Sequence, residues 1–114
     1  MITGSKGMSG AAYLGALAAY RTGTGLVQIY TAKENLVILQ SQIPEAIITT
    51  YEKYDVNELH RLIDWADVVA IGSGDHKKLS VSSFIGVRIS FRKKCCIITA
   101  LQCTNCFLIS FQWK

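Results

Sequence analysis

The sequence has 114 residues, of which half are hydrophobic and 18% are charged, with a single proline. This length is typical of one domain with one core and excludes a second domain, and the composition excludes a disordered or collagen-like chain. No apolar run approaches the ~20 residues that a membrane-spanning helix needs, and the first residues show no basic start followed by an apolar segment, so we expect a cytoplasmic location and no membrane partner.

Charge and composition change along the chain. Residues 1–74 contain five basic and seven acidic side chains, whereas residues 75–114 contain seven basic side chains and one acidic side chain. All four phenylalanines and all four cysteines also lie in 75–114, while eight of the nine glycines precede it. Two segments of different composition are therefore joined near Asp75.

The basic segment 75–114 has several interpretations. Lysine and arginine neutralise phosphates and aromatic rings stack on bases, but here the phenylalanines lie in apolar stretches and no binding signature is present. This favours a solvated basic face, or a segment that does not fold natively, and we expect no nucleic-acid partner. Structural zinc sites usually combine two cysteine pairs, and only one C-x2-C pair occurs, so we expect reduced thiols and no metal at Cys95, Cys96, Cys103 and Cys106.

Helical and strand patterns alternate along residues 1–74. A helix is predicted over residues 9–22, capped by Ser9 and ended by Gly23, and a strand follows from Leu26 to Tyr30. The last strand, Val68 to Ile71, is an apolar run typical of a parallel strand that is covered on both faces. The fold class is therefore α/β, a doubly wound, mostly parallel sheet with flanking helices. Between the strand that ends at Tyr30 and the strand that begins at Val68, we predict a short helix over 35–40, a strand over 46–50 and a helix over 55–64.

The segment from Thr3 to Ala11, TGSKGMSGA, is the most informative local pattern. Three glycines spaced by three residues ahead of a helix let the backbone approach a ligand and direct helix N-terminal amides at an anion, and Lys6 adds a cation. The pattern is neither a Walker loop nor the G-x-G-x-x-G dinucleotide fingerprint. A strand-to-helix turn that needs glycine for its geometry alone explains the spacing equally well.

Four segments occur in a fixed order: GSKGMSGAA from Gly4 to Ala12, AAYRTGTGLV from Ala18 to Val27, Pro44-Glu45, and WADVVAIGSG from Trp65 to Gly74. In this combination the sequence resembles the ADP- or ATP-dependent NAD(P)H-hydrate dehydratases of the ribokinase-like superfamily. The first two blocks are specific to that family among sugar-kinase relatives. The resemblance implies that residues 1–74 form the amino-terminal part of a partial ribokinase-like domain and that residues 75–114 form an atypical tail.

The resemblance also implies an activity and a site. The family repairs hydrated, damaged NADH and NADPH, together called NAD(P)HX, by transferring a phosphoryl group from ADP or ATP, with Mg²⁺ expected, to the ring hydroxyl; elimination then restores the nicotinamide. In the family's pattern, the alanine after the G-M-S-G turn and the last glycine of the I-G-x-G turn line the hydrate site. These two positions correspond to Ala11 and Gly74 in this sequence. Both residues follow strands, so we expect them to converge at the carboxyl edge of the sheet. The family further implies a homo-oligomer.

The family pattern is interrupted after Gly74. Its later Asp-Ala-Asp and G-[ST]-G-D motifs are absent from their expected places, although residues 95–100 align with the strand before the first of them. Residues 72–75 spell G-S-G-D, but their position directly after a strand matches the earlier I-G-x-G turn, so Asp75 as catalytic base is the alternative to a turn residue. We therefore expect a fragment, inactive alone, whose last ~40 residues come from a shifted reading frame. A truncated non-catalytic product and another ribokinase-like small-molecule kinase are the rival interpretations.

Overall fold

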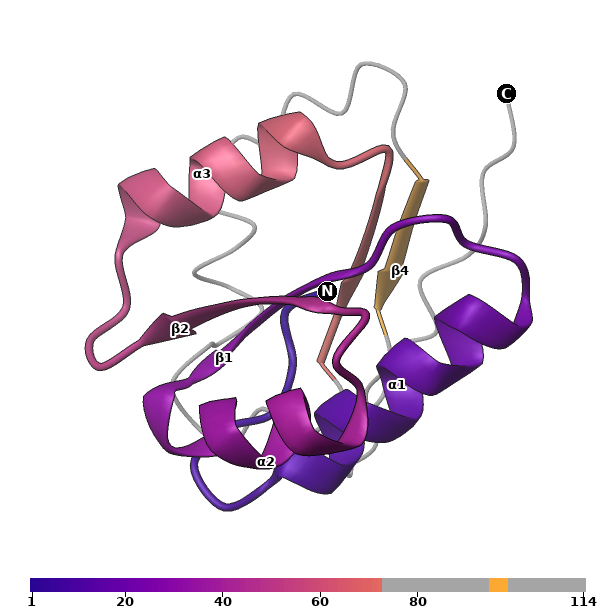
Figure 1. The fold of residues 1–114 in the computed structure, drawn as a ribbon. Helices are drawn as coiled ribbons and strands as arrows, with labels where there is room; N and C mark the ends of the chain where they lie inside the picture. Colours follow the sequence, from indigo (N-terminus) through magenta and orange to yellow (C-terminus); the bar gives the residue numbers. More distant parts are fainter. Residues whose placement is uncertain (73–94, 99–114) are drawn as a thin grey trace, which may run out of the picture.

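The computed structural model describes residues 1–72 and the backbone of residues 95–98, and Figure 1 shows a parallel sheet with helices on both sides. The predicted helix over 9–22 and strand over 68–71 are confirmed, and the backbone of residues 95–98 is a strand. In chain order the elements are α1 Ser9–Arg21, β1 Gln28–Ala32, the 3₁₀ turn η1 Lys33–Asn35, α2 Leu36–Gln42, β2 Ile47–Tyr51, α3 Val56–Trp65, β3 Val68–Ile71 and β4 Cys95–Ile98.

The strands form two parallel pairs joined by the first residues of the chain. β1 pairs with β2 and β3 pairs with β4, both in parallel register. Ile2 makes parallel bridges to Tyr30 in β1 and to Ile71 in β3. Its N–H donates to the Ala70 carbonyl oxygen at 2.8 Å, a normal distance for a strand hydrogen bond. Residues 1–3 therefore occupy the central position between β1 and β3, and the mostly parallel sheet expected from the sequence is confirmed.

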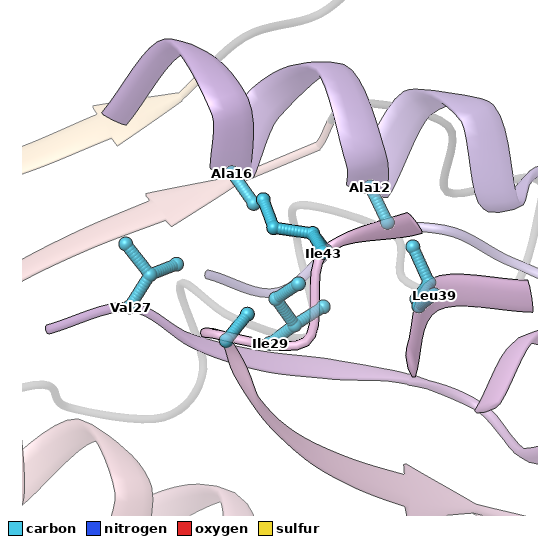
Figure 2. Close-up of a cluster of buried hydrophobic side chains, with 7 residues drawn as sticks. Ala12, Ala16, Val27, Ile29, Leu39 and Ile43 are labelled. Atoms are coloured by element: carbon cyan, nitrogen blue, oxygen red, sulfur yellow. The ribbon is translucent and has the colours of Figure 1, made fainter. Parts of the chain in front are cut away.

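Each face of the sheet packs against its own helices. Ile29 and Tyr30 are adjacent in β1 and belong to different clusters, because successive strand side chains point to opposite faces. The α1 and α2 face, shown in Figure 2, and the α3 face together confirm the doubly wound arrangement. The buried residues are Ala12, Ala16, Val27, Ile29, Leu39, Ile43 and Ala46 on the first face, and Ile2, Tyr30, Leu59, Ile63 and Val69 on the second.

The end of α1 follows the prediction that Gly23 stops it. Gly23 adopts a φ of 93°, and its N–H donates to the Tyr20 carbonyl oxygen at 3.0 Å. The Thr24 N–H reaches back to the Ala19 carbonyl oxygen at 3.2 Å. These two bonds are the pair that a left-handed glycine makes at a helix C-terminus, and they satisfy carbonyls that the helix leaves open.

The start of α1 differs from the predicted Ser9 cap. The residue before the helix is Met8, no side chain caps it, and Ser9 is the first helical residue. The Met8 N–H donates to the Ser5 carbonyl oxygen at 2.8 Å, so the chain already turns over residues 5–8 and carries Ser9 into the helix. The prediction of a Ser9 cap is therefore wrong, because a backbone turn rather than a side chain begins this helix.

The other boundaries depend on long-range pairing or on local caps. β1 extends to Ala32, two residues beyond the predicted end, where the Ala32 N–H donates to the Gly4 carbonyl oxygen at 3.3 Å. α3 begins after Asp55, whose carboxylate accepts from the Asn57 N–H at 2.9 Å and the Glu58 N–H at 3.5 Å. Within residues 1–72 and 95–98, no helix has the length and hydrophobicity needed to cross a lipid bilayer.

Candidate functional site

The carboxyl ends of three neighbouring parallel segments meet at one edge of the sheet. The chain leaves the central segment at Gly4, leaves β1 into η1, and leaves β3 at Gly72. Two backbone bonds hold these exits together: Ala32 N–H donates to the Gly4 carbonyl oxygen at 3.3 Å, and Gly72 N–H donates to the Ile2 carbonyl oxygen at 3.2 Å. Open parallel sheets bind ligands at this edge. We define residues 4–8, which connect the central segment to α1, as the glycine turn.

Two glycines of this turn are required for different reasons. Gly4 has a φ of 74°, and a Cβ built there would lie 2.8 Å from Thr31 Oγ1 and 2.9 Å from Ala12 Cβ. Gly7 has a φ of 81°, but a Cβ there would meet nothing within 4 Å. Glycine is therefore needed at position 4 by both backbone conformation and packing, and at position 7 by conformation alone. The backbone conformation that glycine allows is therefore present at both positions, and contact with a ligand stays a prediction.

Two buried polar side chains donate hydrogen bonds to carbonyl oxygens of the glycine turn. Thr31 is fully buried and Asn35 is 1% exposed. Thr31 Oγ1 donates to the Gly4 carbonyl oxygen at 2.5 Å, and Asn35 Nδ2 donates to the same oxygen at 2.7 Å. Asn35 Nδ2 also lies 3.1 Å from the Ser5 carbonyl oxygen and 3.0 Å from Thr31 Oγ1. Neither side chain was identified as a site residue from the sequence. The sequence shows only that the two residues are four positions apart, where the strand is followed by a helix.

Two exposed ion pairs border the edge. Lys6 Nζ lies 2.9 Å from Glu34 Oε1, and the hydrogen bond from Lys6 holds the pKa of Glu34 below its usual range. Lys33 pairs with Glu52, whose hydrogen bond raises the pKa of the Lys33 ammonium. The Lys6 side chain is 79% exposed, so the pair with Glu34 is weak and the cation remains accessible to solvent beside the turn.

α1 begins directly after the glycine turn. It has no side-chain cap and no acidic residue in its first turn. The partial positive charge of a helix N-terminus favours anionic groups nearby, and here α1's own first turn supplies no side-chain anion to offset it. The glycine turn and the start of α1 together therefore suit the binding and positioning of an anionic ligand by backbone groups.

The three residues predicted for the site have different outcomes. Ala11 lies in the first turn of α1, is partly exposed, and donates its N–H to the Met8 carbonyl oxygen at 3.2 Å. Gly74 and Asp75 lie outside the described residues. The strands that precede Ala11 and Gly74 are adjacent and parallel, joined by the Ile2 bridge to Ile71. The convergence of Ala11 with Gly74, and the role of Asp75, stay predictions.

Magnesium, which the sequence resemblance implies, has no cluster of three or more protein ligands among the described residues. Mg²⁺ is held mainly by carboxylate and phosphate oxygens. In the part of the chain that the structure describes, no group of three or more His, Cys, Asp or Glu side chains is placed to hold a metal ion. We therefore assign no step of a reaction to magnesium at this edge.

Comparisons with known proteins identify relatives of this arrangement. The chain is 38% identical over 74 residues to an ADP-dependent (S)-NAD(P)H-hydrate dehydratase of Lactococcus lactis, a match that covers 65% of this chain and 26% of that protein. It is 36% identical over 74 residues to the bifunctional NAD(P)H-hydrate repair enzyme Nnr of Escherichia coli, covering 65% and 14%. An ATP-dependent (S)-NAD(P)H-hydrate dehydratase of Entamoeba histolytica is 30% identical over 76 residues, covering 65% and 25%. The chain thus spans about a quarter or less of the length of these curated relatives.

Solved structures show the same fold. A ribokinase-like superfamily protein of Enterococcus faecalis superposes with a TM-score of 0.69 at 23% identity, covering 83% of this chain and 34% of that one. A hypothetical protein of Streptococcus mutans superposes with a TM-score of 0.62 at 31% identity, covering 75% and 32%. The family model of the NAD(P)H-hydrate dehydratases matches residues 1–100. This match covers most of the sequence, including the glycine turn and the strands around it, and the chain therefore belongs to the NAD(P)H-hydrate dehydratase family.

Proposed function

We propose that this chain carries part of the hydrate-binding site of an ADP- or ATP-dependent NAD(P)H-hydrate dehydratase. The observation that carries the proposal is the glycine turn, held at the carboxyl edge of a parallel sheet in a chain of this family. Relatives named for ADP and for ATP both match, so the proposal includes either nucleotide as co-substrate. A cytoplasmic location and a homo-oligomeric state belong to the proposal as implications of the family.

The proposed reaction restores NADH or NADPH from its hydrate, NAD(P)HX. A phosphoryl group moves from the nucleotide to the ring hydroxyl, whose oxygen thereby becomes part of a good leaving group. The ring then loses a proton while the carbon–oxygen bond breaks, which releases phosphate and restores the double bond. Magnesium, if it accompanies the nucleotide as the resemblance implies, would be bound through the nucleotide's phosphates and would offset their charge.

In the main assignment, the site residues of this chain contribute binding rather than proton transfer. We assign Ala11 and Gly74 to one wall of the hydrate site, because small residues in turns let the backbone approach a bulky dinucleotide. Asp75 as catalytic base is retained as the alternative assignment. The chain of 114 residues is expected to bind the dinucleotide weakly and to show no turnover of its own, since the phosphoryl donor also needs a positioned binding site.

One experiment tests both parts of the proposal. Purified chain is titrated with NADHX to measure binding, and is separately incubated with NADHX and ADP or ATP while the return of NADH absorbance is followed. Ala11→Leu adds a branched side chain at the proposed wall and is expected to weaken binding about tenfold or more. Ala18→Leu makes the same change on an exposed position two turns along α1 and is expected to leave binding unchanged.

The outcomes that contradict the proposal are distinct. Absence of NADHX binding by the unmodified chain overturns the assigned site. If the Ala11→Leu and Ala18→Leu variants bind NADHX equally well, Ala11 does not line the site, and NADHX binds elsewhere on the chain. Return of NADH at rates typical of an enzyme, about one turnover per second or faster, overturns the expectation that the chain alone is inactive.

A further inference from the structure

Among the described residues, Asn35 is the most deeply buried amide side chain near the glycine turn, and its Nδ2 donates to that turn. It is 1% exposed, and a buried polar group is costly unless it is hydrogen-bonded. Its Nδ2 lies within hydrogen-bond distance of the Gly4 carbonyl oxygen, the Ser5 carbonyl oxygen and Thr31 Oγ1, at 2.7, 3.1 and 3.0 Å. The amide therefore binds two successive carbonyls of a segment that lies about thirty residues earlier in the sequence.

These contacts are not needed by the helix that Asn35 precedes. Asparagine at the position before a helix ordinarily uses its side chain to accept from a backbone N–H of the first turn. Asn35 stands immediately before α2, and its side chain makes no such bond. The side chain is directed instead to the glycine turn, so the local preference of the residue is overridden by a long-range contact.

The network fixes the direction of the backbone in the turn. The Gly4 carbonyl oxygen accepts from Thr31 Oγ1, from Asn35 Nδ2 and from the Ala32 N–H. A peptide unit is planar and trans, so its N–H points opposite to its carbonyl. With the Gly4 and Ser5 carbonyls held toward Asn35, the N–H groups of Ser5 and Lys6 are directed away from the buried network.

We infer that Asn35 is a positioning residue, which sets the conformation of the glycine turn and thereby the binding geometry of the proposed hydrate site. The inference deepens the proposed function and rests on it for the ligand. The positioning itself is inferred from hydrogen bonds within the chain. Asn35→Ala removes the amide donor to the Gly4 and Ser5 carbonyls, and leaves in place the bonds from Thr31 Oγ1 and the Ala32 N–H to Gly4 and from the Met8 N–H to Ser5.

The test compares local hydrogen exchange at the two ends of α1. The Met8 N–H donates to the Ser5 carbonyl oxygen in the glycine turn, and the Gly23 N–H donates to the Tyr20 carbonyl oxygen at the far end. In the Asn35→Ala variant we expect the Met8 amide to exchange at least tenfold faster relative to Gly23 than in the unmodified chain. Asn57→Ala, at an exposed asparagine of α3, is the matched control and is expected to leave this ratio unchanged.

A merely structural role gives a different result. The inference is overturned if Asn35→Ala accelerates the exchange of the Met8 and Gly23 amides by the same factor, or if it accelerates neither, because the ratio of the two rates is then unchanged. Should that variant fail to fold, Asn35→Leu keeps a side chain of similar shape without its donors, and an unchanged ratio of Met8 to Gly23 exchange in that variant also overturns the inference. NADHX binding is measured in parallel and is expected to weaken at least tenfold with Asn35→Ala. Failure of the unmodified chain to bind refutes the proposed function, whereas the exchange ratio still decides the role of Asn35.

Discussion

Replacing Gly4 with alanine perturbs the glycine turn at its most constrained point. An L-residue at a φ of 74° costs about 1–2 kcal/mol relative to glycine. The added Cβ would also lie 2.8 Å from Thr31 Oγ1 and 2.9 Å from Ala12 Cβ. Thr31 Oγ1 is held by its bond to the Gly4 carbonyl and Ala12 lies on a packed helix, so neither atom is the free end of a flexible chain. Such overpacking costs about 1–3 kcal/mol.

Adding the two contributions gives a loss of about 2–5 kcal/mol for Gly4→Ala, a large part of the ~5–15 kcal/mol of a typical domain. Gly7→Ala is the matched control, because it has a φ of 81° but open space around the added Cβ. It is expected to lose only the conformational part, about 1–2 kcal/mol. The difference between the two variants therefore isolates the crowding against Thr31 and Ala12.

Urea unfolding followed by far-ultraviolet circular dichroism measures the free energy of unfolding of both variants. Equal losses of unfolding free energy in Gly4→Ala and Gly7→Ala would show that the added Cβ at position 4 is not crowded. No loss in either variant would show that neither position needs a left-handed backbone. If Gly4→Ala is too unstable to measure, the double variant Gly4→Ala with Ala12→Gly removes one of the two collisions. That double variant is expected to recover a measurable unfolding transition, since removing the Ala12 Cβ relieves part of the crowding.

Three further predictions concern charge and capping. Asp55→Ala removes the cap of α3 and is expected to lower the free energy of unfolding by about 1 kcal/mol in the same urea assay. Burial lowers the pKa of the Met1 amino group to about 6 from 8.0, so the unfolded chain binds more protons between these values. Stability is then expected to rise from pH 6 to pH 8 by up to about 2.7 kcal/mol, measured by urea unfolding at each pH, and an acetylated amino group abolishes this rise. Lys6→Ala is expected to raise the pKa of Glu34 toward its ordinary value in a carboxyl NMR titration, and an unchanged pKa contradicts the hydrogen-bonded ion pair with Lys6 as the cause of the lowered pKa.

The elements with local signals were predictable from the sequence. Gly23 ends α1 by adopting a left-handed conformation, a property of the residue itself. The apolar run of β3 predicts a strand, and its four residues are those predicted, with Val69 buried and Val68 exposed. The periodic apolar residues of α3 likewise identify a helix, within one residue at each end. In each case the information lies within a few residues of the boundary.

The remaining features depend on partners that are distant in the sequence. β1 is displaced toward its carboxyl end relative to the prediction, because pairing with β2 and with Gly4 extends it to Ala32. The bond from Asn35 to Gly4 spans 31 residues, and the bond from Thr31 spans 27. No pattern in a window of ten or fifteen residues contains both partners of such a bond. The supporting network of the site was therefore missed, whereas the glycines that it supports were identified.

This difference bears on which residues of the site matter for binding. Lys6 stands inside the glycine motif and was singled out from the sequence, yet its side chain is 79% exposed and its pair with Glu34 is the kind that contributes little to stability. Asn35 stands outside every motif, yet its buried amide holds two carbonyls of the turn. Asn35→Ala removes one donor from each of these carbonyls, and two lost hydrogen bonds cost about 1–3 kcal/mol together, which corresponds to roughly fivefold to a hundredfold in an equilibrium. The geometry of the glycine turn should consequently be more sensitive to Asn35→Ala than to Lys6→Ala, although only lysine belongs to the recognisable motif.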